Sequence, residues 1–204
     1  IFPNPNAPTS IYLPLDDVRR ILENNRDQVV IVDEAYIDFA GSSAATLVKE
    51  YENLLVIQTT SKSRSLAGLR VGFALGQPSL IQALVSIKDS FNSYTIDRLA
   101  LVGAQASFED VDYFRGVTKR IITTRKRVSR ELDKLGFNGL PSDANFVFAT
   151  HPDYDASVLY DRLFKEGFLV RHFNSERIDQ YLRITIGTDE EMEQFLATLK
   201  RIIS

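Results

Sequence analysis

The chain has 204 residues, of which 44% are hydrophobic and 25% charged, and its formal net charge is −3. These values are typical of a folded globular protein, and the slight acidity argues against nucleic acid as the main partner. The absence of cysteine excludes disulfides and thiolate chemistry. No apolar run approaches the ~20 residues of a membrane span and no signal peptide is visible, so we expect a cytoplasmic protein with no membrane partner.

The first half of the chain alternates strand patterns with helical ones. Ile1-Phe2 reads as the end of a strand, so we expect the chain to be the C-terminal part of a longer one. Apolar residues at helical spacing begin at Leu15. Strand patterns follow at residues 29–32, 54–57 and 71–76, with a short helix expected at residues 47–51. Strands that alternate with helices predict an α/β fold with parallel pairing.

The second half of the chain is richer in helices and ends in short strands. Helices are expected at residues 78–88, around 99–106, and over a long stretch, 114–135, that Gly136 closes. Strands at residues 145–149, 168–173 and 181–186 follow, with a helix at 158–164 and a last helix capped by Thr188 and Glu191. We predict part of a large domain with a mostly parallel sheet over residues 1–130 and a small α+β domain over residues 131–204.

The long helix carries a cluster of basic side chains: Lys119, Arg120, Arg125, Lys126, Arg127 and Arg130. We interpret this cluster as a solvated helix face and not as a nucleic-acid stripe, because acids are interspersed and no aromatic residues alternate with the bases. His151 and His172 lack metal-ligand spacing, so no metal site is expected. No Ser-His-Asp set or dinucleotide fingerprint is present either.

The segment from Thr59 to Arg70 carries the clearest chemical signal. It follows an apolar strand and places hydroxyl residues around Lys62, with Arg70 eight positions later. Hydroxyls, backbone N–H groups and a guanidinium at a strand exit suit a phosphate group. A partly desolvated lysine beside such a group can attack a carbonyl. One loop could therefore hold both the aldehyde and the phosphate of pyridoxal phosphate, although a solvated turn is the alternative.

A second strand exit supports this interpretation. Asp33-Glu34-Ala35-Tyr36 follows the apolar run at residues 29–32. In open α/β sheets, ligands bind beyond the carboxyl ends of the strands. We therefore expect Asp33, Tyr36, Lys62 and Arg70 to converge on one crevice. The structural alternatives are a cap for Asp33, a core phenol for Tyr36 and a surface ion pair for Arg70.

These residues resemble the motifs of the fold-type I pyridoxal-phosphate aminotransferases, and specifically of the histidinol-phosphate aminotransferase group. Five segments match in order: residues 4–10, 33–36, 61–70, 141–146 and 182–187. The resemblance implies amino transfer between histidinol phosphate and 2-oxoglutarate in histidine biosynthesis, with pyridoxal 5′-phosphate as cofactor in a homodimer. Two related pyridoxal-phosphate enzymes, aromatic aminotransferases and threonine-phosphate decarboxylases, are the alternatives, as is a non-catalytic fragment.

The resemblance also implies roles for single residues. Lys62 would bind the cofactor covalently and move protons, while Asp33 would pair with the pyridinium nitrogen and Tyr36 with the 3′-oxygen. Thr59, Ser61 and Arg70 would hold the cofactor phosphate. Arg171 and Arg183 would bind the anionic end of the substrate, with Asn145 nearby.

The sequence departs from the family pattern at several positions. Ala7 stands where the family has an Asn that contacts the cofactor ring, so we assign that contact to Asn6, and Ser10 replaces a usual Gly. Arg64 stands where an aromatic residue is common, and we favour a salt-bridged loop residue over an extra anion contact. The family also has a segment before Asn4 that completes the cofactor site, so these 204 residues alone are expected to bind the cofactor weakly.

Overall fold

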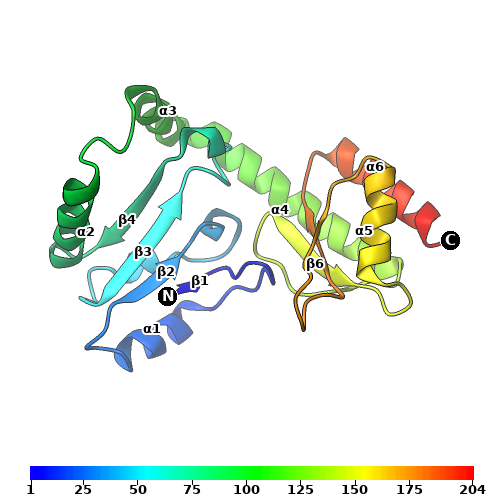
Figure 1. Cartoon of the computed structure of the whole chain (residues 1–204), viewed down its shortest axis with the longest axis horizontal. Helices are drawn as coiled ribbons and strands as arrows, with labels where there is room; N and C mark the ends of the chain where they lie inside the picture. The colour runs from blue at the N-terminus through cyan, green and yellow to red at the C-terminus, as the bar shows by residue number, and fades with distance from the viewer. The chain divides into compact units, whose positions relative to one another are not determined.

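The computed structural model describes residues 1–204, which form two compact units (Figure 1). Unit 1 comprises residues 1–6 and 12–118, and unit 2 comprises residues 7–11 and 119–204. The change of unit after Thr118 and the boundary expected at residue 130 both fall inside one helix, α4 (Val111–Lys134). Each unit is described separately below.

Unit 1 is built on a four-stranded sheet in the order β1-β2-β3-β4. The strands are β1 (Phe2–Pro3), β2 (Val30–Asp33), β3 (Leu54–Thr59) and β4 (Gly72–Gly76). The pairs β1–β2 and β2–β3 are parallel, which confirms the expected α/β fold with a mostly parallel sheet. The pair β3–β4 is antiparallel, so parallel pairing was wrong for this last strand. The connection from β3 to β4, residues 60–71, holds one 3₁₀ turn and no α-helix, the element that usually makes a parallel crossover.

One face of this sheet is covered by helix α1 (Leu15–Glu23), beside β2 in Figure 1. Val18 and Leu22 of α1 are fully buried, and they pack in one cluster with Val32 and Val56 of the sheet. The short helix expected at residues 47–51 is instead a 3₁₀ turn, η2 (Ala44–Leu47), which seals the same cluster. Two further 3₁₀ turns, η1 (Ile37–Phe39) and η3 (Ala67–Leu69), follow the strand exits of β2 and β3.

Helices α2 (Pro78–Phe91) and α3 (Arg98–Glu109) follow β4. No side chain of α2 is buried, and α3 buries only Ala100 and Ala104. The two helices and their linker therefore leave large apolar side chains exposed, among them Phe91 (92% exposed) and Leu99 (81% exposed). Exposed apolar surface of this kind is typical of a face that another protein surface covers.

Unit 2 is a four-stranded antiparallel sheet in the order β5-β6-β8-β7 with helices packed on it. Its strands are β5 (Asn138–Gly139), β6 (Phe146–Thr150), β7 (Arg171–His172) and β8 (Leu182–Thr185). The core joins α4, α5 (Ala156–Lys165) and α6 (Asp189–Ile202) to the sheet through Leu132, Leu163 and Phe195. The strand expected at residues 168–173 is reduced to two residues, while the Thr188–Glu191 capping box is confirmed.

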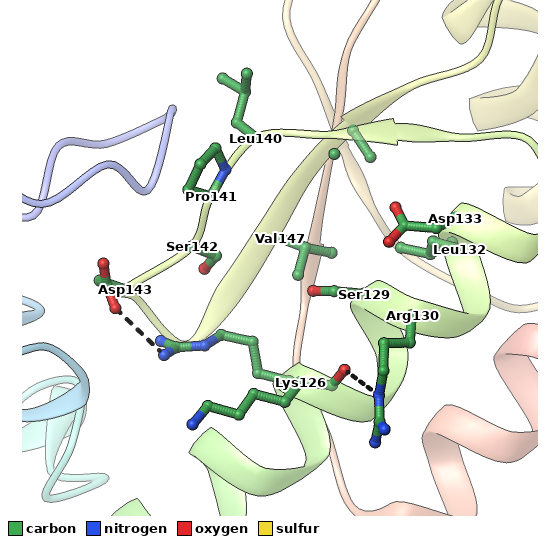
Figure 2. Close-up of a pocket in the computed structure, with 13 residues that line it drawn as sticks. Lys126, Ser129, Arg130, Leu132, Asp133, Leu140, Pro141, Ser142, Asp143 and Val147 are labelled. Carbon is green, nitrogen blue, oxygen red and sulfur yellow. Dashed lines mark hydrogen bonds and ion pairs between the residues drawn. The ribbon is translucent and has the colours of Figure 1, made fainter.

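One residue of the basic helix cluster, Arg125, is buried, so the interpretation of the cluster as a solvated face was wrong at this position. Its side chain is only 6% exposed, its Nη1 donates to the Ala144 carbonyl at 2.6 Å, and its Nη2 lies 3.5 Å from the Asp143 carboxylate. Figure 2 shows this contact at Asp143, in a hollow of about 690 Å³ beside α4, with Lys126 and Arg130 on the helix. Burial lowers the pKa of the Arg125 guanidinium, and Asp143 opposes that shift.

None of the helices combines the length and the apolar character that crossing a bilayer requires. No group of three or more His, Cys, Asp or Glu side chains is arranged to hold a metal ion.

Candidate active site

The predicted site residues of unit 1 lie at one end of the strands. This end of the sheet, where the parallel strands have their carboxyl ends, is called the edge. Asp33 ends β2, where it pairs in register with Pro3 of β1 and Ile57 of β3. Thr59 ends β3 opposite Gly72, the first residue of β4. Because β1, β2 and β3 are parallel, their carboxyl ends meet at this edge, and the antiparallel β4 brings its amino end there. The edge is where ligands bind in open α/β sheets.

Two acids at the carboxyl end of β2, Asp33 and Glu34, point in opposite directions, because successive residues along a strand point to opposite faces of the sheet. Asp33 is half-buried, and its Oδ1 accepts the backbone N–H of Ala35 at 3.0 Å, which orients the carboxylate. The Asp33 carbonyl also accepts the backbone N–H of Asn4 at 2.8 Å, which anchors the loop that carries Asn6. The side chain of Asn4 is buried and holds the same loop against Leu13.

Glu34 is a buried acid whose role the sequence did not indicate. Its side chain is only 1% exposed and accepts three hydrogen bonds, from the Ser43 hydroxyl, the Ala44 N–H and the Gln58 amide. Burial raises the pKa of the Glu34 carboxyl, and the hydrogen bonds from Ser43, Gln58 and Ala44 oppose that rise. Glu34 therefore links β2, β3 and η2 behind the edge that carries Asp33.

The β3 exit is a cluster of hydroxyl groups. The Thr59 hydroxyl accepts the backbone N–H of Ser61 at 3.1 Å and lies 2.9 Å from the Ser61 hydroxyl. It also lies 3.1 Å from the Val71 carbonyl, which accepts from the Thr60 N–H and hydroxyl as well. Two hydroxyls and a backbone N–H thus gather where a phosphate was expected.

Lys62 extends from this cluster and is exposed. Its Nζ lies 5.4 Å from the centroid of the Tyr36 ring, within the range of a cation–π contact. The structure therefore brings together the lysine and the phenol that the sequence placed 26 positions apart, within one unit.

Arg70 is at the expected edge, but its guanidinium turns back on its own loop. Its Nη1 donates to the Ala67 carbonyl at 2.7 Å, and the side chain is exposed. Arg70 is also in the left-handed region at φ 56°, as is Ser65 in the same loop. Non-glycine residues in that region cost energy, and such strain occurs often at functional sites.

Arg64 forms no salt bridge, so the favoured interpretation of a salt-bridged loop residue was wrong. Its guanidinium carbon lies 4.0 Å from the Phe108 ring centroid and 4.1 Å from that of Phe114. Its Nη1 donates to the Ser107 carbonyl. Burial lowers the pKa of the Arg64 guanidinium, and Asp38 opposes that shift.

The other predicted residues lie together in unit 2. Arg171 on β7 stands directly opposite Arg183 on β8. Both guanidinium groups lie over the Phe173 ring, at 5.3 Å and 5.8 Å, and Arg183 also lies 5.0 Å from the Phe146 ring centroid. The Nε of Arg183 is buried and has no hydrogen-bond partner. Asn145 precedes β6, and its carbonyl accepts from Ile186 at 2.9 Å, just past the end of β8.

The match to known proteins covers nearly the whole chain. The model of the family "Aminotransferase class I and II" matches residues 1–199, and the chain belongs to this family. Over its full length the chain is 54% identical to a histidinol-phosphate aminotransferase of Clostridium acetobutylicum. Over 203 residues it is 56% identical to one of Acinetobacter baumannii. It spans 58% and 56%, respectively, of the length of these two curated relatives.

A solved structure supports the fold. The structure of histidinol-phosphate aminotransferase from Sinorhizobium meliloti, in complex with pyridoxal-5′-phosphate, superposes with a TM-score of 0.88 at 29% identity. The superposition covers 98% of this chain and 56% of that one. The resemblance that the sequence motifs indicated is therefore confirmed at the level of the family and the fold.

Proposed function

We propose that the protein is an aminotransferase, or the part of one that carries its reactive lysine, with pyridoxal 5′-phosphate as cofactor. The observation that carries the proposal is the single edge at which Lys62, Tyr36, Asp33, Thr59 and Ser61 leave the sheet. The names of the relatives at 54% and 56% identity favour histidinol phosphate as the substrate, and the family resemblance adds 2-oxoglutarate and a role in histidine biosynthesis.

The residues at this edge fit the cofactor in both charge and hydrogen-bonding capacity. The hydroxyls of Thr59 and Ser61 would hold the phosphate, and the Ser61 N–H and Arg70 would join them by releasing the Thr59 hydroxyl and the Ala67 carbonyl, respectively. Asn6 would contact the cofactor ring from the loop that Asn4 anchors beside Asp33. When bound, pyridoxal phosphate supplies a ring that draws negative charge from the substrate α-carbon.

Three side chains of this chain would perform the chemistry. Lys62 would hold the aldehyde end covalently and then move a proton at the substrate α-carbon. Asp33 would keep the pyridine nitrogen protonated, which requires a carboxylate at that position. Tyr36 would donate its phenol proton to the 3′-oxygen.

The two arginines of unit 2 support an anionic substrate. Like charges directly opposite each other in a sheet are destabilising. An anion between Arg171 and Arg183 would offset their repulsion and stabilise the pair. The unpaired, buried Nε of Arg183 adds a donor without a partner. A phosphate or carboxylate of the substrate would satisfy both, with Asn145 beside them.

The assembly that we propose is a cytoplasmic homodimer that binds neither nucleic acid nor membranes. The exposed apolar side chains of α2 and α3 support a second protein surface on unit 1.

The test is to add pyridoxal phosphate to the protein, reduce with borohydride and map the modified residue by mass spectrometry. We expect one adduct on Lys62 and none in Lys62→Ala. Transfer of the amino group from glutamate to imidazole-acetol phosphate then identifies the substrate pair. Release of carbon dioxide from threonine phosphate would instead favour the decarboxylase. Adducts scattered over surface lysines would overturn the proposal.

A further inference from the structure

Arg64 lies between two aromatic rings, two positions after Lys62. The rings belong to Phe108, in the last turn of α3, and Phe114, in the first turn of α4, with guanidinium-to-centroid distances of 4.0 Å and 4.1 Å. Phe108 is itself held by an edge-to-face contact with Phe73 of β4, at 5.5 Å between centroids. All of these residues belong to unit 1.

This arrangement fixes the direction of the Arg64 side chain. The guanidinium contacts both rings, and its hydrogen bond to the Ser107 carbonyl adds a third contact, so the side chain has little freedom to change direction. A hollow of about 270 Å³ adjoins the guanidinium and is lined by Gly103, Tyr113 and other residues. The Arg64 guanidinium is therefore not closely packed on every side. The two rings and the Ser107 carbonyl set its position.

The residues next to Lys62 in the chain are also anchored, in this case by hydrogen bonds. Ser63 is only 4% exposed, and its hydroxyl donates to the Asp38 carboxylate in the turn that follows Tyr36. The Leu66 N–H donates to the Thr60 carbonyl at 3.1 Å, which closes the loop around Lys62. Between Thr60 and Leu66 only Lys62 and Ser65 are exposed, and Ser65 is held in the left-handed region at φ 56°.

Packing alone does not explain an arginine at position 64. No salt bridge involves Arg64, and its partial burial disfavours the charged form, which Asp38 and the two rings favour. An apolar side chain would fill the space between two rings without that desolvation cost. What the guanidinium adds is contact with both rings together with a directed hydrogen bond to the Ser107 carbonyl, and these contacts orient the loop.

We propose that Arg64, clamped between Phe108 and Phe114, is a positioning residue that sets the direction in which Lys62 leaves its loop. The inference rests on the proposed function of Lys62 as the cofactor-binding amine. It adds that the reactivity of Lys62 depends on the side chains of Phe108 in α3 and Phe114 in α4, which act through Arg64.

The test compares Arg64→Met, which keeps the length of the side chain, with the unchanged protein. Capture of pyridoxal phosphate is stopped with borohydride at timed intervals, and the adduct on Lys62 is quantified. We expect capture about tenfold slower, because small displacements of a reacting group cost about that much or more. The visible circular dichroism per bound cofactor, which reports orientation, should also fall.

Matched variants separate the clamp from a general loss of structure. Arg64→Lys keeps the cation but loses the planar fork, so partial rescue is expected. Phe108→Leu should slow capture less than Arg64→Met, and the double variant should be no slower than Arg64→Met alone. Arg20→Met is the control, because the Arg20 side chain is 75% exposed on α1. If Arg64→Met does not fold, Phe114→Leu replaces it.

Capture by Arg64→Met at the unchanged rate, with unchanged visible circular dichroism, would overturn the clamp and leave the proposed function intact. If no variant captures the cofactor on Lys62, the proposed function fails and the clamp is tested without cofactor. Hydrogen exchange of residues 61–66, and acetylation of Lys62 relative to Lys119, should then rise in Arg64→Met. No change in either measurement would overturn the clamp as well.

Discussion

The Nζ of Lys62 lies 5.4 Å from the centroid of the Tyr36 ring, although the two residues follow different strands. The contact means that the ring supports the lysine from one side, whereas the proposed role of the residue toward the cofactor belongs to its phenol oxygen. The two properties of Tyr36 can therefore be separated by substitution.

Tyr36→Phe keeps the ring under Lys62 and removes only the hydroxyl. We expect the affinity for pyridoxal phosphate to fall about tenfold, since one hydrogen bond to a charged oxygen contributes about 1.5 kcal/mol or more. Tyr36→Leu should weaken binding further, because it also removes a cation–π contact of about 0.5–1 kcal/mol. Fluorescence titration with the cofactor measures both. Equal affinities for all three proteins would contradict a ligand at this phenol.

Asp33→Asn tests whether a carboxylate is required at the end of β2. The amide oxygen can still accept the Ala35 N–H, so the local turn should persist. Amino transfer should fall about 100-fold or more, because a neutral amide does not stabilise a protonated pyridine nitrogen. The borohydride-fixed adduct on Lys62 should remain, which distinguishes lost chemistry from lost binding. Unchanged turnover would exclude the assigned role.

Glu34 predicts how stability depends on pH. Burial raises the pKa of Glu34 in the folded state above the ordinary value of 4.5, which applies to the unfolded chain. At a pH between the unfolded and the folded pKa, the folded chain therefore binds more protons than the unfolded chain. The stability that this group contributes is full below its unfolded pKa and is lost as pH rises through its folded pKa. Urea unfolding across this window should show stability decreasing with pH.

Glu34→Gln should remove that slope and also lower stability by about 1–3 kcal/mol, because an amide NH₂ would face N–H and O–H donors. Glu52→Gln, at an exposed position, is the control. A slope that survives in Glu34→Gln must come from another group.

Arg125→Met tests the buried guanidinium of unit 2 (Figure 2). The substitution leaves the Ala144 carbonyl without its donor and Asp143 without its cation. We expect a loss of about 1–3 kcal/mol in the free energy of unfolding, since Asp143 is partly solvated and keeps some hydration. Arg130→Met, on the exposed side of the same helix, should change stability by less than about 0.5 kcal/mol. Equal effects of the two substitutions would argue against a structural role for Arg125.

Arg171 and Arg183 predict a response to anions. Inorganic phosphate should raise the melting temperature by about 2–4 °C in the unchanged protein, as expected for about 1 kcal/mol of binding. Arg171→Met should reduce that rise while leaving the protein without phosphate at least as stable, because it removes a like-charge opposition. An undiminished phosphate response in Arg171→Met and in Arg183→Met would show that the response comes only from the hydroxyl cluster of unit 1 or from another site.

The strands and most helices could be predicted from the sequence because their signals are local. The apolar runs of β2 and β3, and the cap at Thr188, need no knowledge of distant residues. The direction of β4 was wrong, because an apolar run has the same pattern in either direction. The length of the connection, residues 60–71, does not decide the direction, and only the folded loop shows that no crossover helix forms there.

The environments of single charged residues were harder to predict. Arg125 is four positions after Ile121 and three before Val128, so it lies on the buried stripe of α4, a signal that the charge concealed. Arg64 depends on two rings more than forty positions away, and no local pattern indicates that contact. The direction of the Arg70 side chain is set by the carbonyl of Ala67, which only the folded loop presents.

The loop that carries Lys62 starts and ends at residues that face each other across the sheet, Thr59 and Gly72. Its two ends are therefore held at a fixed separation by the strands. An inserted or deleted residue would have to be absorbed inside the loop, where Ser65 and Arg70 already occupy the left-handed region. Among natural variants of this protein we expect side chains in the loop to change while its length stays constant.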